Sequence, residues 1–309
     1  MIITLTCNPA CDRTLIVPGF RHSDVTRVIS RHDAAGGKGL NVARALATLG
    51  GTCQAIVPLG GATGAHVASL ASAEGLTLTT VPIHDQTRTC LLVTDPEAPD
   101  QLVINEPGPQ VSAAEWQTLR QAVITAANTA DYLTISGSLP PGIDATNLRH
   151  LINDIPSTCA VLLDTSGAPL TACLDARIAL LKINASELSQ AIGRPVTSHA
   201  EVVTAARMVC ANGPRAVVIT LGAAGAIAVD ASGAWYVAAP TIHAVSPVGS
   251  GDCTLAGIAM AFQHGLSLAQ ALHCGVAAGS ANALIPHAGV FDINQYTLFC
   301  QQLTVTLLD

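Results

Sequence analysis

Apolar residues recur along the chain in two patterns, short unbroken runs and stripes with helical spacing. The short runs predict buried strands at Ile2–Thr6, Gln54–Leu59, Thr77–Val81, Tyr132–Ser136, Ala160–Leu163, Ile178–Ile183 and Ala216–Leu221. Stripes at Leu40–Leu49 and Ala65–Glu74 predict helices, and capping boxes that begin at Ser112 and Ser198 predict two more. This alternation predicts an α/β fold, a mainly parallel sheet with helices on both faces, whose ligands bind at the carboxyl ends of the strands.

Two segments, Arg13–Val17 and Thr89–Ile104, break this alternation and are typical of exposed strands. Turn residues at Pro96–Asp100 make the second segment a predicted hairpin. Its apolar residues alternate as one face of a hairpin does, at Leu91, Val93, Leu102 and Ile104. Both segments fit a small β lid over the open end of the sheet. Because a hairpin cannot bury its own apolar face, we expect that face to cover the ligand site or to pair with the lid of a second copy in a homodimer.

The length fits one large α/β domain, or a large domain with a small one, and we expect a single domain over residues 1–309. Half of the residues are hydrophobic and 11% are charged, so the chain can bury a sizeable core. The net charge of −7 and the absence of a Lys/Arg run argue against a nucleic-acid partner. Ten cysteines are scattered without a CxxC pair or zinc spacing, and the N-terminus has no signal-peptide pattern. We therefore expect a reduced, cytoplasmic protein.

A long uncharged stretch needs a separate explanation, because no Asp, Glu, Lys or Arg occurs between Cys253 and Phe291. Its length would suffice for a membrane span. However, Gln263-His264-Gly265 interrupts it near its start, further polar residues follow, and Pro286 ends it. Two buried helices of a soluble core explain the stretch better, so we expect no membrane partner.

The sequence Pro247-Val248-Gly249-Ser250-Gly251-Asp252 leads directly into the apolar helix Cys253–Phe262. Glycines at a helix start let backbone N–H groups point at an anion, which the positive end of the helix also attracts. A carboxylate beside an anion is unfavourable unless it acts on it. General-base catalysis next to a transferring phosphoryl group is an action that fits. The alternative is that Asp252 merely caps the helix after an ordinary glycine-rich turn.

A second glycine-rich sequence, Gly36-Gly37-Lys38-Gly39-Leu40-Asn41-Val42-Ala43, also opens a helix. It is not a Walker A loop, because Gly39 follows Lys38 where that motif requires Ser or Thr. Its glycines permit a ligand to approach closely, Lys38 supplies a positive charge, and Asn41 can hydrogen-bond to hydroxyl groups. A tight turn with a surface lysine is the alternative.

These two sequences, in this order and about 210 residues apart, resemble the two signatures of the PfkB (ribokinase-like) carbohydrate kinases. Three further segments resemble the branch with 1-phosphofructokinase, tagatose-6-phosphate kinase and the minor 6-phosphofructokinase: Ile104–Pro109, Gly137–Gly142 and Asp164–Gly167. Three more are similar to elements of the whole family, although Ile183 replaces a usual proline: Thr6–Asp12, Lys182–Glu187 and Thr220–Gly225. The resemblance covers nearly the whole chain. It implies a ribokinase-like three-layer domain with a lid formed by segments near 13–17 and 88–106.

The resemblance also implies ATP and Mg²⁺ as cofactors and gives the site residues their roles. Asp252 would accept the proton of the attacking hydroxyl, while the backbone N–H groups of Gly249, Ser250 and Gly251 stabilise the transferring phosphoryl group. The implied sugar-binding residues are Asp12, Gly37, Asn41 and Ser138. Those implied on the nucleotide side are Lys182 near the ATP phosphates, Thr220, Gly222 and Gly225 along the cleft, and Ser280 and Asn282 near the adenine. Asn184 and Glu187 would position Mg²⁺, through water.

Lys38 and Arg88 bear on the class of substrate, since the resemblance brings both to the sugar site. Two cations suit a dianionic phosphate, and Arg can bind it bidentately; two solvated surface cations are the alternative. We therefore expect a ketohexose that is already phosphorylated, tagatose 6-phosphate or fructose 6-phosphate, with fructose 1-phosphate as the alternative. Ser250, where Ala is common, favours the tagatose-6-phosphate kinase type.

Two other functional classes stay open at this point. Gly60-Gly61-Ala62-Thr63-Gly64 follows a predicted strand as a dinucleotide-binding turn does. It lacks the full GxGxxG spacing, and no acidic residue ends the next strand, which disfavours an NAD-dependent enzyme. A non-catalytic regulator that binds sugar phosphates would be expected to have lost the base, yet Asp252 and its anion loop are intact.

Overall fold

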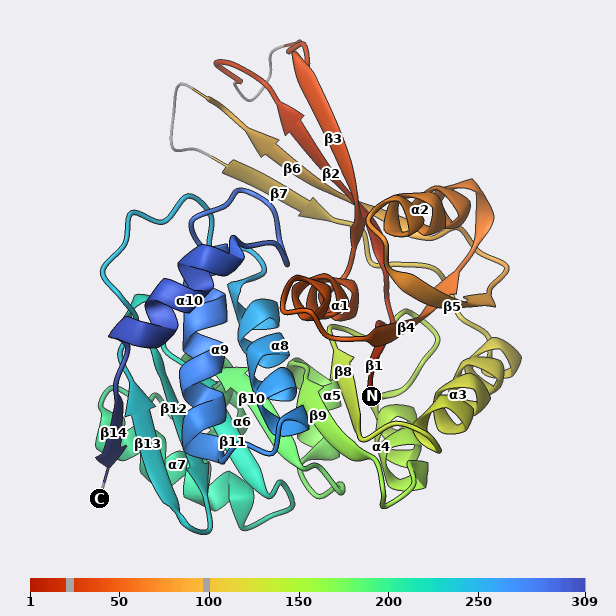
Figure 1. Ribbon diagram of the computed structural model, residues 1–309. Helices are drawn as coiled ribbons and strands as arrows, with labels where there is room; N and C mark the ends of the chain where they lie inside the picture. The colour runs from red at the N-terminus through yellow and green to blue at the C-terminus, as the bar shows by residue number, and fades with distance from the viewer. Residues whose placement is uncertain (21–24, 97–100, 309) are drawn as a thin grey trace.

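The computed structural model describes residues 1–20, 25–96 and 101–308 (Figure 1). Its main sheet contains seven parallel strands: β1 (Ile2–Leu5), β4 (Cys53–Leu59), β5 (Thr77–Pro82), β8 (Tyr132–Ser136), β9 (Ala160–Asp164), β10 (Leu180–Asn184) and β11 (Ala216–Thr220). Three antiparallel strands extend one edge: β12 (Ala226–Asp230), β13 (Gly233–Val237) and β14 (Val305–Leu308). The spatial order is β14-β13-β12-β11-β10-β9-β8-β1-β4-β5. All seven predicted strands are confirmed within two residues at each end; the antiparallel edge was not predicted.

Helices cover both faces of this sheet and make three layers (Figure 1). One face carries α1 (Lys38–Thr48), α8 (Ser250–Gln263), α9 (Leu268–Asn282) and α10 (Ile293–Gln302). The other carries α3 (Ala113–Ala127), α4 (Ala145–Asp154), α5 (Gly167–Cys173), α6 (Ala185–Ile192) and α7 (His199–Cys210). Each face has its own core: Leu162 and Val218 face the first, and their strand neighbours Leu163 and Val217 face the second. Burial on both faces explains the unbroken apolar runs of the parallel strands.

The predicted capping boxes are both present, with Ser112 starting α3 and Ser198 starting α7. The uncharged stretch after Asp252 forms α8 and α9, which pack against one another, as predicted. Within the described residues, no helix combines the length and apolar character that a membrane crossing requires.

A second, four-stranded sheet projects from the carboxyl end of the main sheet as the lid (Figure 1). Its strands are β2 (Ala10–Ile16), β3 (Ser30–Gly36), β6 (Arg88–Thr94) and β7 (Gln101–Asn105), in the order β3-β2-β6-β7. The helix α2 (Gly61–Ala73) packs against its base. The sequence did not predict β3, because Ser-Arg-His-Asp-Ala-Ala-Gly shows no apolar alternation. The turn predicted at Pro96–Asp100 lies, after Pro96, outside the described residues.

The pairing of β6 with β7 shows whether the apolar residues predicted to share one face of the lid do so. Leu91 pairs with Ile104 and Val93 with Leu102, so these four residues do share one face. Asp12, which is expected to bind the sugar, pairs with Cys90 and therefore lies on the opposite face. The register thus disfavours the alternative that the Leu91–Ile104 face covers the sugar site. Leu102 and Ile104 are 36% and 46% exposed, which leaves pairing with another chain open to this face.

Candidate active site

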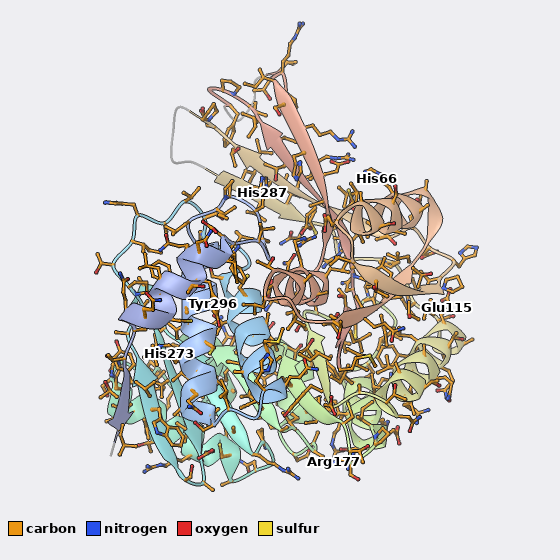
Figure 2. All side chains as sticks on the ribbon, viewed as in Figure 1. His66, Glu115, Arg177, His273, His287 and Tyr296 are labelled. Atoms are coloured by element: carbon orange, nitrogen blue, oxygen red, sulfur yellow. The ribbon has the colours of Figure 1, made fainter. Side chains whose placement is uncertain are left out.

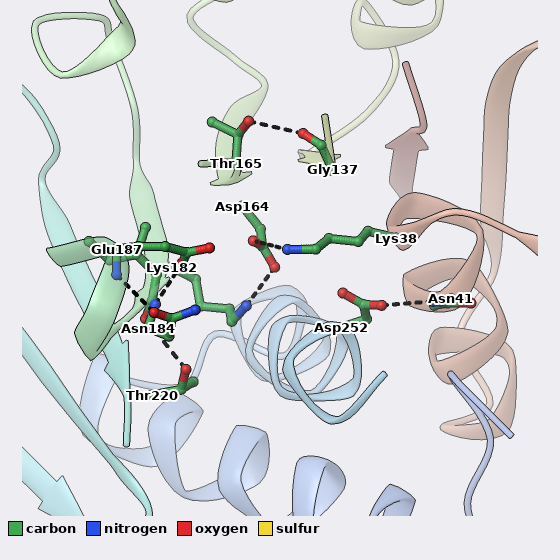
Figure 3. Close-up of polar contacts among 11 residues, drawn as sticks. Lys38, Asn41, Gly137, Asp164, Thr165, Lys182, Asn184, Glu187, Thr220 and Asp252 are labelled. Atoms are coloured by element: carbon green, nitrogen blue, oxygen red, sulfur yellow. Dashed lines mark hydrogen bonds and ion pairs between the residues drawn. The ribbon is translucent and has the colours of Figure 1, made fainter. Parts of the chain in front are cut away.

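The Gly-Ser-Gly-Asp sequence occupies the first turn of α8. Gly249 is the N-cap with φ of +84°, and a Cβ there would lie 2.6 Å from Cα of Ala288. Both observations require glycine. The Asp252 carboxylate makes no capping hydrogen bond but accepts one from Asn41 Nδ2 at 2.8 Å, 211 residues away (Figure 3). The structure therefore does not support the alternative that Asp252 only caps the helix.

The environment of Asp252 prepares it to take up a proton. Burial and then the nearby Asp164 carboxylate raise the pKa of Asp252 to about 6, against the opposing effects of Lys38, Lys182 and the Asn41 hydrogen bond. The side chain is nearly inaccessible, since the residue is 5% exposed. A carboxylate with a pKa near the working pH suits a general base better than an ordinary surface carboxylate.

Asp164, at the end of β9, is the residue that joins the two halves of the site (Figure 3). It is fully buried, and its carboxylate accepts hydrogen bonds from Lys38 Nζ at 3.0 Å and Lys182 Nζ at 2.5 Å. Burial alone would raise the pKa of Asp164, but the two ammonium groups outweigh it and lower that pKa. No chemical role was predicted for Asp164, although its place just after a predicted parallel strand was a usable signal.

Lys38 is not a free surface lysine, because its half-exposed side chain is ion-paired with the buried Asp164. The Asp164 carboxylate first, and Asp252 in addition, raise the pKa of Lys38 despite its partial burial. The ammonium group stays charged beside the anion loop. Lys38 shares its partner Asp164 with Lys182. Among the described residues, Lys38 and Arg88 have no hydrogen-bond partner in common.

The sugar side of the site lies where the lid meets the main sheet. Burial raises the pKa of Asp12 to about 6, while Arg88, Arg44 and a hydrogen bond from the Gly37 backbone oppose the rise. A Cβ at Gly36 would lie 2.1 Å from Cγ of Asp12. The Gly-Gly pair therefore leaves the space that this carboxylate occupies.

Arg88 reaches in from the first residue of β6. Its Nη1 and Nη2 donate to the carbonyl oxygens of Glu106 and Asn8, each at 2.9 Å. Its buried Nε has no hydrogen-bond partner in the described part of the chain. Asn8 Nδ2 lies 3.3 Å from Ser138 Oγ, while Asn8 Oδ1 is likewise buried and unpaired there. A polar group is thus formed by Arg88, Asn8 and Ser138, in which Arg88 Nε is an unpaired donor and Asn8 Oδ1 an unpaired acceptor among the described residues.

The nucleotide-side residues lie at the ends of β10 and β11. Asn184 and Glu187 form a capping box of α6, in which each side chain accepts a hydrogen bond of 2.8 Å from the other's backbone N–H. This capping box went unnoticed in the sequence. Thr220 ends β11, and Gly222 and Gly225 follow with φ of +61° and +101°. A Cβ at Gly225 would lie 2.0 Å from the Val237 carbonyl oxygen, which requires glycine at this turn.

The capping box bears on a divalent cation. Capping uses one carboxylate oxygen of Glu187 and the side-chain amide oxygen of Asn184. The two side chains therefore cannot surround a metal ion with their own oxygens alone. The second Glu187 oxygen remains, and this carboxylate raises the pKa of Lys38 from across the site. Such a donor set fits an ion that keeps most of its water, as Mg²⁺ does.

Ser280 and Asn282, expected near the adenine, are both buried in α9. The Asn282 amide donates to the carbonyl oxygens of His287 and Val290 at 2.9 and 2.8 Å, and its Oδ1 lies 3.4 Å from Ser250 Oγ. It is fully inaccessible. Asn282 therefore braces the turn 287–290 beside the anion loop, which is a supporting position and not one that reaches a nucleotide base.

A second cluster of ligand-type side chains lies where the lid meets α2, the helix that carries His66 (Figure 2). Cys11, Asp33 and His66 bring ligand atoms within 4.8 Å of one another. However, the Asp33 oxygens already accept hydrogen bonds from Arg13, Arg31 and His66. Two guanidinium groups beside the carboxylate disfavour a metal ion there, so the cluster fastens the lid to α2.

Comparison with known proteins agrees with this geometry. Residues 6–290 match the model of the pfkB family of carbohydrate kinases. ATP-dependent 6-phosphofructokinase isozyme 2 of Escherichia coli is 36% identical over 286 residues, covering 92% of both chains, and 1-phosphofructokinase of Borreliella burgdorferi is 30% identical with the same coverage. A crystal structure of the Escherichia coli phosphofructokinase-2 in complex with fructose-6-phosphate superimposes with a TM-score of 0.91 at 33% identity, covering 97% of this chain and 98% of that one.

A buried carboxylate beside a glycine-rich helix start, with two lysines nearby, suits phosphoryl transfer. The chain belongs to the pfkB family of carbohydrate kinases, and it is a kinase of the phosphofructokinase type with an alcohol group as acceptor. The ribokinase-like fold with its β lid is confirmed by the same similarity.

Proposed function

We propose that this enzyme transfers the γ-phosphoryl group of ATP to a hydroxyl of a phosphorylated ketohexose, with fructose 6-phosphate or tagatose 6-phosphate as substrate. The observation that carries the proposal is the buried Asp252 carboxylate held by Asn41 at the anion loop. The Nε–H of Arg88, unpaired among the described residues and a positively charged donor beside Asn8 and Ser138, supports a phosphate already on the sugar. The relatives named 6-phosphofructokinase support fructose 6-phosphate, whereas tagatose 6-phosphate rests on Ser250 alone.

In the proposed reaction, Asp12, Gly37 and Asn41 hold sugar hydroxyls so that one hydroxyl faces the γ-phosphorus. Its oxygen forms the new P–O bond while its proton passes to Asp252, and ADP leaves with the electrons of the broken bond. The N–H groups of Gly249, Ser250 and Gly251, with Lys38 and Lys182, stabilise the charge on the transferring group. Mg²⁺, held through water by Asn184 and Glu187, would neutralise charge on the ATP phosphates.

Fructose 1-phosphate is the second candidate substrate, because other relatives of similar identity are named 1-phosphofructokinase. The two substrates differ in which hydroxyl attacks, the 1-hydroxyl of a 6-phosphate or the 6-hydroxyl of a 1-phosphate. A cytoplasmic location, where ATP and sugar phosphates are available, belongs to the proposal.

An ATP-coupled assay with fructose 1-phosphate, fructose 6-phosphate, tagatose 6-phosphate and the free hexoses tests the proposal. We expect kcat/KM to be highest for one of the three phosphates. A preference for a free hexose would contradict the sugar-phosphate assignment. Binding of sugar phosphates without turnover of any of them would identify a non-catalytic regulator instead.

The base gives a pH dependence that can be measured directly. Asp252 accepts a proton only when ionised, and its pKa is raised to about 6, so kcat should fall as the pH drops through about 6. An ordinary carboxylate would keep the rate constant to about pH 4. A pH profile at saturating substrate checks this, and a rate that stays flat down to pH 5 would contradict it.

The exposed lid supports a homodimer as part of the proposal. Val103 and Ile104 are 56% and 46% exposed, on opposite faces of β7, which is an edge strand of the lid. A tetrameric form is described for Escherichia coli phosphofructokinase-2, so a relative does assemble. Apolar strands left bare in this way favour pairing with a second lid.

Ile104→Asp should convert the dimer to a monomer, because it places a charge in the proposed apolar contact. Met208→Asp, a matched change of an exposed apolar residue on α7 (52% exposed), should leave the dimer intact. Sedimentation velocity at micromolar concentration distinguishes the species. A wild-type protein that sediments as a monomer would rule the dimer out.

A further inference from the structure

Arg44 lies one helical turn after Asn41 on α1. Its guanidinium group makes more hydrogen bonds than an arginine on the surface needs. Its side chain is 11% exposed. Nε donates to Glu74 Oε2 at 2.8 Å, Nη2 donates to the Ala35 carbonyl oxygen at 2.7 Å, and Nη1 donates to Asn41 Oδ1 and the Ala288 carbonyl oxygen at 3.0 and 3.1 Å. One guanidinium therefore connects α1, the end of α2, the lid strand β3 and the turn after α9.

The contact with Asn41 decides which way its amide points. A guanidinium has donors and no acceptor, so the Asn41 atom that faces Arg44 must be the carbonyl oxygen. The amide nitrogen then faces Asp252, to which it donates at 2.8 Å. Without Arg44, Asn41 Oδ1 loses its donor and, among the described residues, only the Asp252 carboxylate orients the amide, so the N–H is held less firmly at Asp252.

The contact with Ala288 reaches the anion loop by a second route. The turn 287–290 lies against that loop, because a Cβ at Gly249 would meet Ala288 Cα at 2.6 Å. It also lies against α1, because a Cβ at Gly289 would lie 2.7 Å from the backbone carbonyl oxygen of Asn41. Arg44 fixes this turn from one side and Asn282 from the other.

We propose that Arg44 is a positioning residue for phosphoryl transfer, which holds the Asn41 amide N–H at Asp252 and the turn 287–290 against the anion loop. It touches no reacting atom itself, and the proposal depends on the proposed role of Asp252 as the base. A planar fork with five N–H groups is needed for four acceptors in different directions, so Lys cannot replace Arg here.

The other charged groups around Asp252 stay in place when Arg44 is changed. They are Asp164 from β9, Lys182 from β10 and Lys38 from α1. The Asn41 hydrogen bond lowers the pKa of Asp252, so losing it raises that pKa. Because the base works only when ionised, the acid limb of the kcat profile then moves to higher pH. The charge of Arg44 also lowers the pKa of Asp12, so a charge-preserving variant is needed beside a neutral one.

The test compares Arg44→Met, Arg44→Lys, Asn41→Ala and the double variant Asn41→Ala/Arg44→Met, using the ketohexose phosphate that wild type turns over best. Arg44→Met and Arg44→Lys should both lower kcat by about 10–100-fold, the scale of a misplaced catalytic group, with a smaller change in KM. Their acid limbs should lie at higher pH, and the double variant should lose less than the sum of the two single losses, because part of the Arg44 effect passes through Asn41. Arg120→Met, which removes an ion-paired arginine from α3, should match wild type.

Additive losses with Asn41→Ala, or an acid limb at the wild-type pH, would overturn the proposal and leave Arg44 a merely structural role. The carboxyl pKa of Asp252 can also be followed without substrate, by ¹³C NMR of aspartate-labelled protein with Asp252→Asn as the assignment reference. We expect this pKa to rise in Arg44→Lys, and an unchanged value would contradict the proposal. If wild type turns over no sugar phosphate, the proposed function fails, while this titration still tests Arg44.

Discussion

Asp252→Asn should lower kcat by about 10²–10⁴-fold, the usual scale for loss of a general base. Asn has nearly the same shape and its carbonyl oxygen can still accept the hydrogen bond from Asn41, but it cannot take the proton of the attacking hydroxyl. The change also removes a buried negative charge close to Asp164, so Tm should not fall. A coupled kinase assay and thermal unfolding measure the two effects.

Asp144→Asn is the matched control, because Asp144 caps α4 and Asn caps a helix equally well. It should leave both kcat and Tm unchanged. ATP binding to Asp252→Asn, measured by calorimetry, should remain close to wild type. Turnover of Asp252→Asn near the wild-type rate would exclude Asp252 as the base.

Arg88→Ala should weaken the use of phosphorylated sugars far more than the use of free ones. Loss of a charge-assisted hydrogen bond costs about 1.5–3 kcal/mol, which is roughly one to two powers of ten in kcat/KM. The unpaired Nε of Arg88 is the donor available for a substrate phosphate among the described contacts of this side chain. Its Nη groups hold the carbonyl oxygens of Asn8 and Glu106, so some loss of Tm is also expected.

Lys38→Ala should act in the same direction but should also lower kcat, because it leaves the buried Asp164 with one ammonium partner. The double variant should lose less than the sum of the singles if both cations bind one phosphate. Arg149→Ala, which removes an exposed ion pair with Asp175, is the control. Equal weakening of free and phosphorylated sugars by Arg88→Ala would contradict the phosphate assignment and leave the kinase assignment standing.

Local sequence was enough for the elements whose side chains fix their own structure. The parallel strands could be predicted because both of their faces are buried, so their apolar runs are unbroken. Ser112 and Ser198 marked helix starts because capping is a contact between residues three apart. The strand β3 escaped prediction because its side chains carry no apolar pattern, and β14 because its partner β13 lies far back in the chain. The hairpin β12–β13 joins neighbouring segments, and the apolar run of β12 was a signal that went unused.

By itself, the sequence determined the α/β class and placed Asp252 in the first turn of a glycine-rich helix start, because that is a local arrangement. Only the tertiary structure decided which groups surround this carboxylate. Asp164 meets Lys38 across 126 residues, and Asn41 meets Asp252 across 211. Arg44 stands next to a recognised motif, yet its importance lies in acceptors from three other elements. The direction of a side chain and the partners it reaches depend on how the layers pack, which spacing along the chain does not encode.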